Sequence, residues 1–452
     1  MSGSPPEPNP GALRKRVWRL MELAGEELYL GRPDLEIKGQ KFNAALLLGV
    51  LTALFQGREL IMGEPGLGKT TSAEYLAALF YSLPLELVWQ AGIAGHPEQT
   101  EEKIVGRPDL AALQAGREQV VWSYFALLPA KIVDELNRLP ETKQSLILDA
   151  VDRGKWEYLN QAVYNPEFCL FATANYQDRG SNSILLPLLD RFDVMVESKH
   201  PGPNLACQVG RTGVTAAALK GEDLAQELRA FFQAGPRAAE RSRGLEKICG
   251  RFAARVQAAI GLATFTAADR AAARREKEAV PLDLDANAFL RLLIAELSFC
   301  LQFGQKRIQE TCVEGCHFAG YLCHELVNCI SNRFPQSIRN YAQGLAWLMG
   351  DPQVELAHLL ALAPYTLAHR LEWKEGFVAR GEREARRDPA PLHLARLATE
   401  RLHQSYVEQA HRIREALTVA HRIWEGEDLT PLEGDHPLFH EIRRDLGREG
   451  ED

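Results

Sequence analysis

A glycine-rich segment between residues 59 and 71 has the residue types and spacing of a phosphate-binding loop. It reads ELIMGEPGLGKTT and fits the pattern G-x-x-x-x-G-K-[ST]. Glycines let backbone N–H groups turn towards phosphate oxygens, the lysine reaches the β- and γ-phosphates, and the threonine hydroxyl can bind Mg²⁺. The candidate nucleotide-binding residues in this loop are Gly63, Glu64, Pro65, Gly66, Leu67, Gly68, Lys69, Thr70 and Thr71.

The residues on either side of this loop fit the context that such a loop requires. The apolar run Leu60–Met62 predicts a strand that enters the loop, and residues 71–82 predict a helix with one apolar face that leaves it. A bound phosphate would then lie at a helix N-terminus, where backbone N–H groups favour an anion. A chance glycine-rich turn is the alternative, and the two fitting flanks argue against it.

A pair of carboxylates lies in the segment 130–138, which reads AKIVDELNR. The apolar residues predict a strand, and Asp134 and Glu135 would lie at its carboxyl end, facing the crevice of a parallel α/β sheet. There Asp134 would hold Mg²⁺ together with Thr70, and Glu135 would orient and activate water. An acidic strand end on the surface is the alternative, and the preceding phosphate loop argues against it.

Three further polar residues lie where a nucleotide site could use them. Asn175 follows the predicted strand 168–174 and either bonds the γ-phosphate or the attacking water, or simply ends the strand. Arg191, in the segment 184–194, lies between a short helix and a strand. It either reaches the nucleotide of a neighbouring subunit or is a solvated charge. Gln40 precedes a predicted helix and is included among the nucleotide-binding candidates.

The other elements are assigned from apolar spacing and turn residues. Helices are expected over residues 12–30, 42–55, 109–116, 141–152, 222–234, 251–278 and 396–424. Residues 85–90 and 119–125 are expected to be extended, residues 91–106 to form a loop, and residues 152–155 to turn into a hairpin.

The length and composition are typical of a globular protein with several domains. The chain has 452 residues, 46% hydrophobic and 25% charged, with a formal net charge of −8. This acidic balance argues against a general nucleic-acid-binding surface. Residues 1–11 lack the apolar core of a signal peptide, and no apolar run approaches the length of a membrane span. With eight cysteines and a nucleotide motif, the expected location is the reducing cytoplasm.

Taken in order, these motifs resemble those of the MoxR family of AAA+ ATPases. The segment V-D-E-L-N-R-L-P is similar to the family's D-E-I-N-R-A-P, and Thr173-Ala174-Asn175 resembles its sensor 1. Residues 189–192 resemble the arginine-finger segment, and residues 361–370 resemble the end of the lid. Ser337-Ile338-Arg339 resembles the family's S-P-R, which would make Arg339 sensor 2, although isoleucine replaces the proline.

The resemblance implies an α/β fold: a P-loop AAA+ core, with a parallel five-stranded sheet between helices, followed by an all-α lid and a helical C-terminal extension. The expected division is a flexible tail over 1–11, the core over 12–200, a helical linker or insertion over 201–285, the lid over 286–380 and the extension over 381–452.

The resemblance also implies a function. It predicts an ATPase that uses ATP and Mg²⁺ and works as a homo-oligomeric ring, expected to be a hexamer. Such a ring would remodel or mature a partner protein, with a metalloenzyme as client and a von Willebrand factor A domain protein as partner. Glu135, Asn175, Arg191 and Arg339 would be its catalytic residues.

Two rival functions stay open from sequence. One is a nucleic-acid-associated AAA+ motor whose inserted hairpin, with Arg153 and Lys155 at its turn, contacts DNA. The acidic composition and the lack of an added DNA-binding motif disfavour it. The other is a nucleotide switch or scaffold that does not hydrolyse ATP. The complete set Lys69, Asp134, Glu135 and Arg191 disfavours it, because a scaffold has no need of all four residues.

A group of cysteines allows a further hypothesis. Thiolates with neighbouring histidines can bind zinc or an iron–sulfur cluster, but the spacings lack the paired C-x₂-C pattern, and buried cysteine is also a common core residue. The core alternative is therefore favoured. The residues concerned are Cys300, Cys312, Cys316, His317, Cys323, His324 and Cys329.

Overall fold

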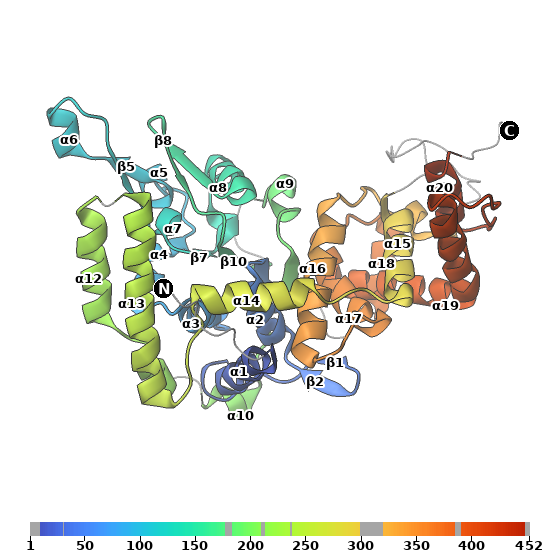
Figure 1. The fold of residues 1–452 in the computed structure, drawn as a ribbon, viewed down its shortest axis with the longest axis horizontal. Coiled ribbons are helices and arrows are strands. Elements are labelled where there is room, and N and C mark those ends of the chain that lie inside the picture. Colours follow the sequence, from blue (N-terminus) through green and yellow to red (C-terminus); the bar gives the residue numbers. More distant parts are fainter. Residues whose placement is uncertain are drawn as a thin grey trace. The chain divides into compact units, whose positions relative to one another are not determined.

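The computed structural model describes residues 10–29, 31–176, 183–208, 213–235, 237–298, 320–384 and 390–447 (Figure 1). The chain divides into two compact units, Met1–Ala279 and Val280–Asp452. In the described part, no helix combines the length and the apolar character that a membrane crossing needs.

The first unit is built on a parallel five-stranded sheet with the order β11-β3-β10-β7-β4. Its middle strands are buried, because helices cover both faces, as parallel sheets require. This finding confirms the predicted fold class. The strands are β3 (Arg58–Met62), β4 (Ile93–Ala94), β7 (Ala130–Asp134), β10 (Cys169–Ala174) and β11 (Val194–Glu197).

Helices α2 (Ala44–Phe55) and α3 (Lys69–Tyr81) agree with the expected ones, whereas the helix expected over 12–30 comprises α1 (Pro10–Leu23) and a π-helical turn, Ala24–Leu28. The Asn43 side chain caps α2 by accepting a hydrogen bond from the N–H of Leu46 at 2.9 Å. Before α2, β1 (Leu35–Ile37) and β2 (Gln40–Phe42) form a small antiparallel hairpin.

The expectation of a strand at residues 85–90 is wrong, because these residues form helix α4 (Leu85–Ala91). Its buried residues Leu85, Val88 and Ala91 recur at helical spacing, and Pro84 sets a backbone angle that suits a helix start. The sheet's next strand is instead the short β4.

Two insertions extend from the sheet, and each contains an antiparallel pair of strands. The first comprises α5 (Glu101–Ile104), β5 (Gly106–Pro108), α6 (Leu110–Gln114) and β6 (Val120–Trp122), and is followed by α7 (Tyr124–Leu127). The expected extended stretch 119–125 therefore ends early, because Ser123 caps α7. The second is the predicted hairpin, β8 (Lys155–Tyr158) and β9 (Gln161–Tyr164), which follows α8 (Glu141–Arg153).

Further helices complete the first unit: α9 (Leu186–Leu189), α10 (Pro203–Ala206), α11 (Val214–Ala218), α12 (Glu222–Gln233), α13 (Ala238–Ile260) and α14 (Ala267–Glu278). The single helix expected over 251–278 is in fact two, because Gly261 ends α13 in a left-handed conformation and Thr266 caps α14. An ion pair of 2.7 Å joins Arg16 of α1 to Asp269 of α14. The expected linker thus packs largely on the core.

The regular secondary structure of the described part of the second unit consists of helices. It contains α15 (Leu284–Ser298), α16 (Arg333–Met349), α17 (Leu356–Leu367), α18 (Glu375–Glu384), α19 (Ala390–Trp424) and α20 (Pro437–Asp445). The long amphipathic helix expected at 396–424 is α19, which packs against α15 and α17 with Leu402, Tyr406 and Ile413 buried. The expected lid and extension therefore share one core here, while the expected residue boundaries stay predictions.

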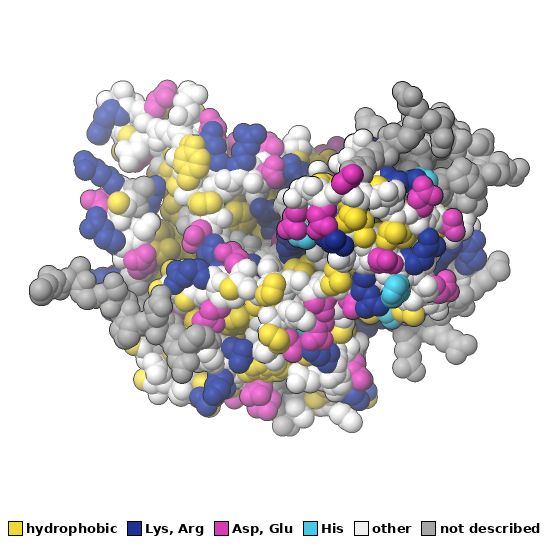
Figure 2. All heavy atoms as spheres, turned by 45° about the vertical axis from the view of Figure 1, so that its right-hand side comes forward, with side chains coloured by type: hydrophobic (Ala, Val, Ile, Leu, Met, Phe, Trp, Pro, Cys, Tyr) yellow, Lys and Arg dark blue, Asp and Glu magenta, His cyan; other side chains and the backbone are white. Residues whose placement is uncertain are grey.

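On the face drawn in Figure 2, basic and acidic side chains of the described residues are interspersed. This distribution agrees with the acidic composition and shows no single basic surface on the described residues of that face.

Candidate active site

The phosphate loop connects β3 to α3 and depends on three glycines with positive φ. Gly66 and Gly68 have φ of +79° and +73°, a region that glycine adopts without strain, and a Cβ atom there would meet nothing within 4 Å. Gly63 has φ of +148°, and a Cβ atom there would lie 2.7 Å from the carbonyl oxygen of Ser198. The loop therefore needs glycine for its backbone shape, and it borders open space where a phosphate can lie.

Lys69 is the first residue of α3, and its side chain turns back over the loop. Its ammonium group donates to the carbonyl oxygens of Gly63 (2.6 Å) and Glu64 (2.9 Å) and to Oδ1 of Asn175 (2.7 Å). Burial lowers the pKa of Lys69, and nearby carboxylates, first Asp134, act in the opposite direction. Lys69 and Asn175, far apart in sequence, are thus direct neighbours.

Asp134 ends β7 beside the phosphate loop. Its Oδ1 accepts hydrogen bonds from the hydroxyls of Thr70 and Thr173, each at 2.5 Å. Thr173 is brought there by β10, whose Ala172 pairs with Val133 of β7. The set offers hard oxygen atoms on adjacent elements, which is the ligand chemistry that Mg²⁺ prefers.

Glu135 has an unusual backbone conformation, with φ of +50°. Its N–H donates to Oγ1 of Thr173 at 2.9 Å, and its carboxylate forms an ion pair of 3.0 Å with Arg138. Gly95 lies directly against it, since a Cβ atom there would come within 2.0 Å of the Glu135 carbonyl oxygen. A left-handed glutamate held by its neighbours is the kind of strain found at functional sites.

Residues 59–192 match the family model of the AAA domain, dynein-related subfamily. The chain therefore contains an AAA domain over these residues, as the resemblance of its motifs to the MoxR family of AAA+ ATPases predicted. The matched range contains the phosphate loop, both carboxylates, Asn175 and Arg191.

A solved structure supports the same fold. A candidate ATPase from Cytophaga hutchinsonii is similar with a TM-score of 0.54 and 14% identity, covering 83% of this chain and 93% of that one. A full-length MCM homolog from Methanopyrus kandleri has a TM-score of 0.41 at 13% identity, covering 80% of this chain and 61% of that one. The second score is below the level that indicates a shared fold. Comparison with curated proteins gives no match.

The arginine of the AAA+ finger segment does not join this cluster. Arg191 forms a two-pronged ion pair with Asp152 at the end of α8, with both N···O distances at 3.2 Å, and donates to the carbonyl oxygen of Pro187 at 2.8 Å. Among the described residues, no hydrogen bond or ion pair links Arg191 to the phosphate loop of its own chain. The role in a neighbouring subunit stays a prediction.

Two other candidates lie outside the cluster as well. Gln40 is exposed in β2, and Arg339 is exposed on α16 in the second unit. The structure thus brings together Lys69, Thr70, Asp134, Glu135 and Asn175, while the roles of Gln40 and Arg339 stay predictions.

Three residues of the AAA+ site were not singled out from sequence. Thr173 bonds both carboxylate residues, Asn137 donates to the carbonyl oxygen of Asn175 at 3.2 Å, and Gly95 packs on Glu135. Thr173 and Asn137 had a signal, because they lie in the segments that resemble sensor 1 and the family's D-E-I-N-R-A-P. Gly95 had none, because its contact depends on how the strand ends lie side by side.

The cysteine hypothesis falls mostly outside the described residues, as Cys300, Cys312, Cys316 and His317 are not among them. Cys323 is buried and Cys329 is exposed. Within the described ranges, no group of three or more potential ligands could hold a metal ion.

Proposed function

We propose that this protein hydrolyses ATP and uses the reaction to remodel or mature a partner protein, with a metalloenzyme as client. The observation that carries the proposal is the contact of Asp134 with Thr70 at 2.5 Å, directly beside Glu135 and within the same cluster as Lys69. A phosphate-binding lysine, a magnesium-binding pair and an acidic residue next to them are the parts that phosphoryl transfer to water requires.

The residues present fit ATP and Mg²⁺. The loop from Gly63 to Gly68 offers its backbone N–H groups to the phosphates, and the ammonium group of Lys69 would exchange carbonyl partners for phosphate oxygens. Thr70 and Asp134 would hold the metal. When bound, Mg²⁺ neutralises charge on the β- and γ-phosphates.

Glu135 is the residue that we assign to the attacking water. Its carboxylate would accept the water's proton, and Asn175 would bond the γ-phosphate or the water from the adjacent strand end. The ion pair with Arg138 gives this carboxylate a resting partner, so its movement away from Arg138 would be part of each turnover.

We assign Arg191 to the site of the next subunit in a homo-oligomeric ring, expected to be a hexamer. Support comes from its contacts, which lie with α8 and α9 rather than with its own phosphate loop. Arg339 would contact the γ-phosphate from the lid, and Gln40 would contact the nucleotide. A von Willebrand factor A domain protein is the expected partner, and the cytoplasm the expected location.

The experiment that tests the proposal is steady-state phosphate release from Mg-ATP by the parent protein and by Glu135→Gln. The amide keeps the shape of the side chain and loses the base, so turnover should fall about 10²–10⁴-fold while ATP binding remains. Glu141→Gln, an exposed carboxylate change at the start of α8, is the control and should match the parent. A parent protein without ATPase activity, or normal turnover by Glu135→Gln, would refute the proposal.

A further inference from the structure

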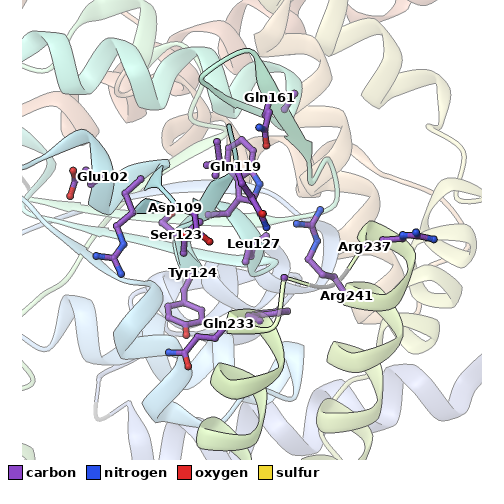
Figure 3. A pocket seen from close by; sticks show the side chains of 17 residues that line it. Glu102, Asp109, Gln119, Ser123, Tyr124, Leu127, Gln161, Gln233, Arg237 and Arg241 are labelled. Carbon is purple, nitrogen blue, oxygen red and sulfur yellow. The ribbon is translucent and has the colours of Figure 1, made fainter. Parts of the chain in front are cut away.

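A cavity lies in the first unit, lined by none of the residues assigned to the nucleotide. It has a volume of about 520 Å³, within the range of ligand sites, and lies between the strand pair β5–β6, the hairpin β8–β9 and the ends of α12 and α13 (Figure 3). Residues from all four parts line it, so the two insertions and the helices that follow the sheet build one site.

Arg241 is the main charged group of this cavity. It is half-buried on α13, and Figure 3 shows its side chain extending into the space below Gln161, whereas Arg237 points away. Burial lowers the pKa of Arg241, and within the described chain no carboxylate forms an ion pair with it. A desolvated guanidinium without a counter-charge favours an anionic ligand.

The other charged residues of the wall are two carboxylates and two arginines, of which Arg237 points away from the cavity (Figure 3). Arg107 and Arg237 add two exposed guanidinium groups, and among the described residues neither forms an ion pair. Asp109 already caps α6, with Oδ1 accepting from the N–H groups of Ala111 (2.9 Å) and Ala112 (3.1 Å). Glu102 is exposed at the edge of the site in Figure 3.

The remaining lining is suited to a peptide backbone. The amides of Gln119, Gln161 and Gln233 can both donate and accept, and Tyr124 and Phe232 contribute aromatic surface with ring centroids 6.1 Å apart. These amides match the N–H and C=O groups of a peptide backbone, whereas the sugar–phosphate backbone of DNA offers only acceptors, which favours a peptide.

We propose that this cavity binds an acidic segment of a protein partner, with a carboxylate paired to Arg241 and the segment's backbone bonded to the glutamine amides. The binding site is independent of the proposed ATPase, because it uses none of the residues assigned to ATP. A partner segment held here would contact both insertions at once.

Fluorescence anisotropy of the full-length protein with a labelled oligoglutamate peptide tests the proposal. The parent should bind oligoglutamate in a salt-dependent way, and it should not bind an oligoglutamine peptide. Arg241→Gln should weaken binding at least about tenfold, as expected for the loss of a charge-assisted pair. Arg107→Gln, at an exposed position, should weaken it less.

Arg243→Gln is the matched control, because Arg243 lies on the same helix outside the cavity and donates to Ala239 of its own turn at 3.2 Å. It should bind like the parent. Oligoglutamate that fails to bind, or binding that Arg241→Gln does not weaken, would overturn the proposal. Arg241-dependent binding of oligothymidylate without binding of oligoglutamate would also overturn it in favour of nucleic acid. ATP affinity, measured in parallel, should be unchanged in all variants.

Discussion

The ammonium group of Lys69 donates hydrogen bonds to three oxygen atoms of the protein. Phosphate oxygens of ATP would have to replace these acceptors or share the ammonium group with them. Two of the acceptors are loop carbonyls and the third is the amide oxygen of Asn175, all within 2.9 Å of the ammonium nitrogen. A lysine so placed both keeps the loop in shape and offers its charge to a phosphate. At the residue scale, the lysine and asparagine therefore act as a unit.

Lys69→Ala should abolish tight ATP binding, because it removes the charge that faces the β- and γ-phosphates. Isothermal titration with Mg-ATP should show a loss of at least about a hundredfold in affinity, given about 1.5–3 kcal/mol for each charged hydrogen bond lost. Lys247→Ala, an exposed lysine change on α13, should leave the affinity unchanged. An unaltered Kd in Lys69→Ala would show that this loop is not the nucleotide site.

The members of the site could be predicted from sequence because their types and spacing are fixed by the chemistry. Lys69, Thr70, Asp134 and Glu135 occupy motif positions, and their clustering follows from parallel strands that end at one edge. The partner of Arg191 could not be predicted in the same way. Asp152 reaches it only through the packing of α8 against α9, which no local pattern encodes.

At the scale of elements, the end of β7 is held in place by close backbone packing. The N–H of Gly95 donates to the carbonyl oxygen of Asp134 at 2.6 Å, and no side chain fits between them. The glycine therefore sets where both carboxylates lie, although it is expected to touch no ligand. Its sequence neighbourhood indicated only a loop.

Gly95→Ala should displace the end of β7, because its Cβ atom would lie 2.0 Å from the carbonyl oxygen of Glu135. We expect ATP hydrolysis to fall at least about tenfold, as misplacement by about 1 Å can reduce rates a hundredfold. Gly92→Ala is the control, since its Cβ atom would meet nothing nearer than 3.4 Å. Equal ATPase rates in the two variants would show that this contact does not position the carboxylates.

A second element-scale feature is Glu59, buried in β3 beneath the phosphate loop. Burial raises its pKa to about 8, and a hydrogen bond with Thr52 offsets this only in part. The folded protein therefore holds this proton more tightly than the unfolded chain does. Stability should fall as the pH rises from about 4.5 towards about 8, by about 1.4 kcal/mol per pH unit from this group.

Glu59→Gln should remove the loss of stability that this carboxyl causes as the pH rises. The variant's Tm should therefore exceed that of the parent at pH 8, with little difference at pH 5. Thermal unfolding at both pH values measures the difference. Glu36→Gln, an exposed change in β1, should leave the pH dependence as it is in the parent. The same pH dependence in Glu59→Gln as in the parent would show that this carboxyl does not bind the proton.

The helix at residues 85–91 shows the limit of sequence patterns at this scale. Its apolar residues suit both a buried strand and a helix, and the choice is made by Pro84 and by packing against α3 and β7. The long α19 was predictable because its apolar stripe continues over many turns.

At the scale of the whole molecule, we expect a neighbouring subunit to complete the proposed ATPase site. The cluster around Lys69 contains the predicted metal ligands and Glu135, whereas Arg191, the predicted arginine finger, is paired with Asp152 on α8. If the finger acts in the next subunit, assembly controls activity, and such a residue can contribute about 10³–10⁵ in rate.

The ATPase rate per subunit should therefore rise with protein concentration as rings form. Rates measured over a dilution series, together with mass by light scattering, should rise along the same curve. A constant rate per subunit in a strict monomer would contradict the shared site.

The most direct measurement is the ATPase rate of two inactive variants, Arg191→Ala and Glu135→Gln, before and after mixing. In an equal random mixture, about a quarter of the interfaces join an intact Glu135 to an intact Arg191 from the neighbour. The account predicts that each variant alone is nearly inactive, that the mixture regains up to about a quarter of the parent rate, and that the double variant stays inactive in the same mixing protocol. An Arg191→Ala protein that hydrolyses ATP at the parent rate, or a mixture no more active than its parts although rings form, would contradict it.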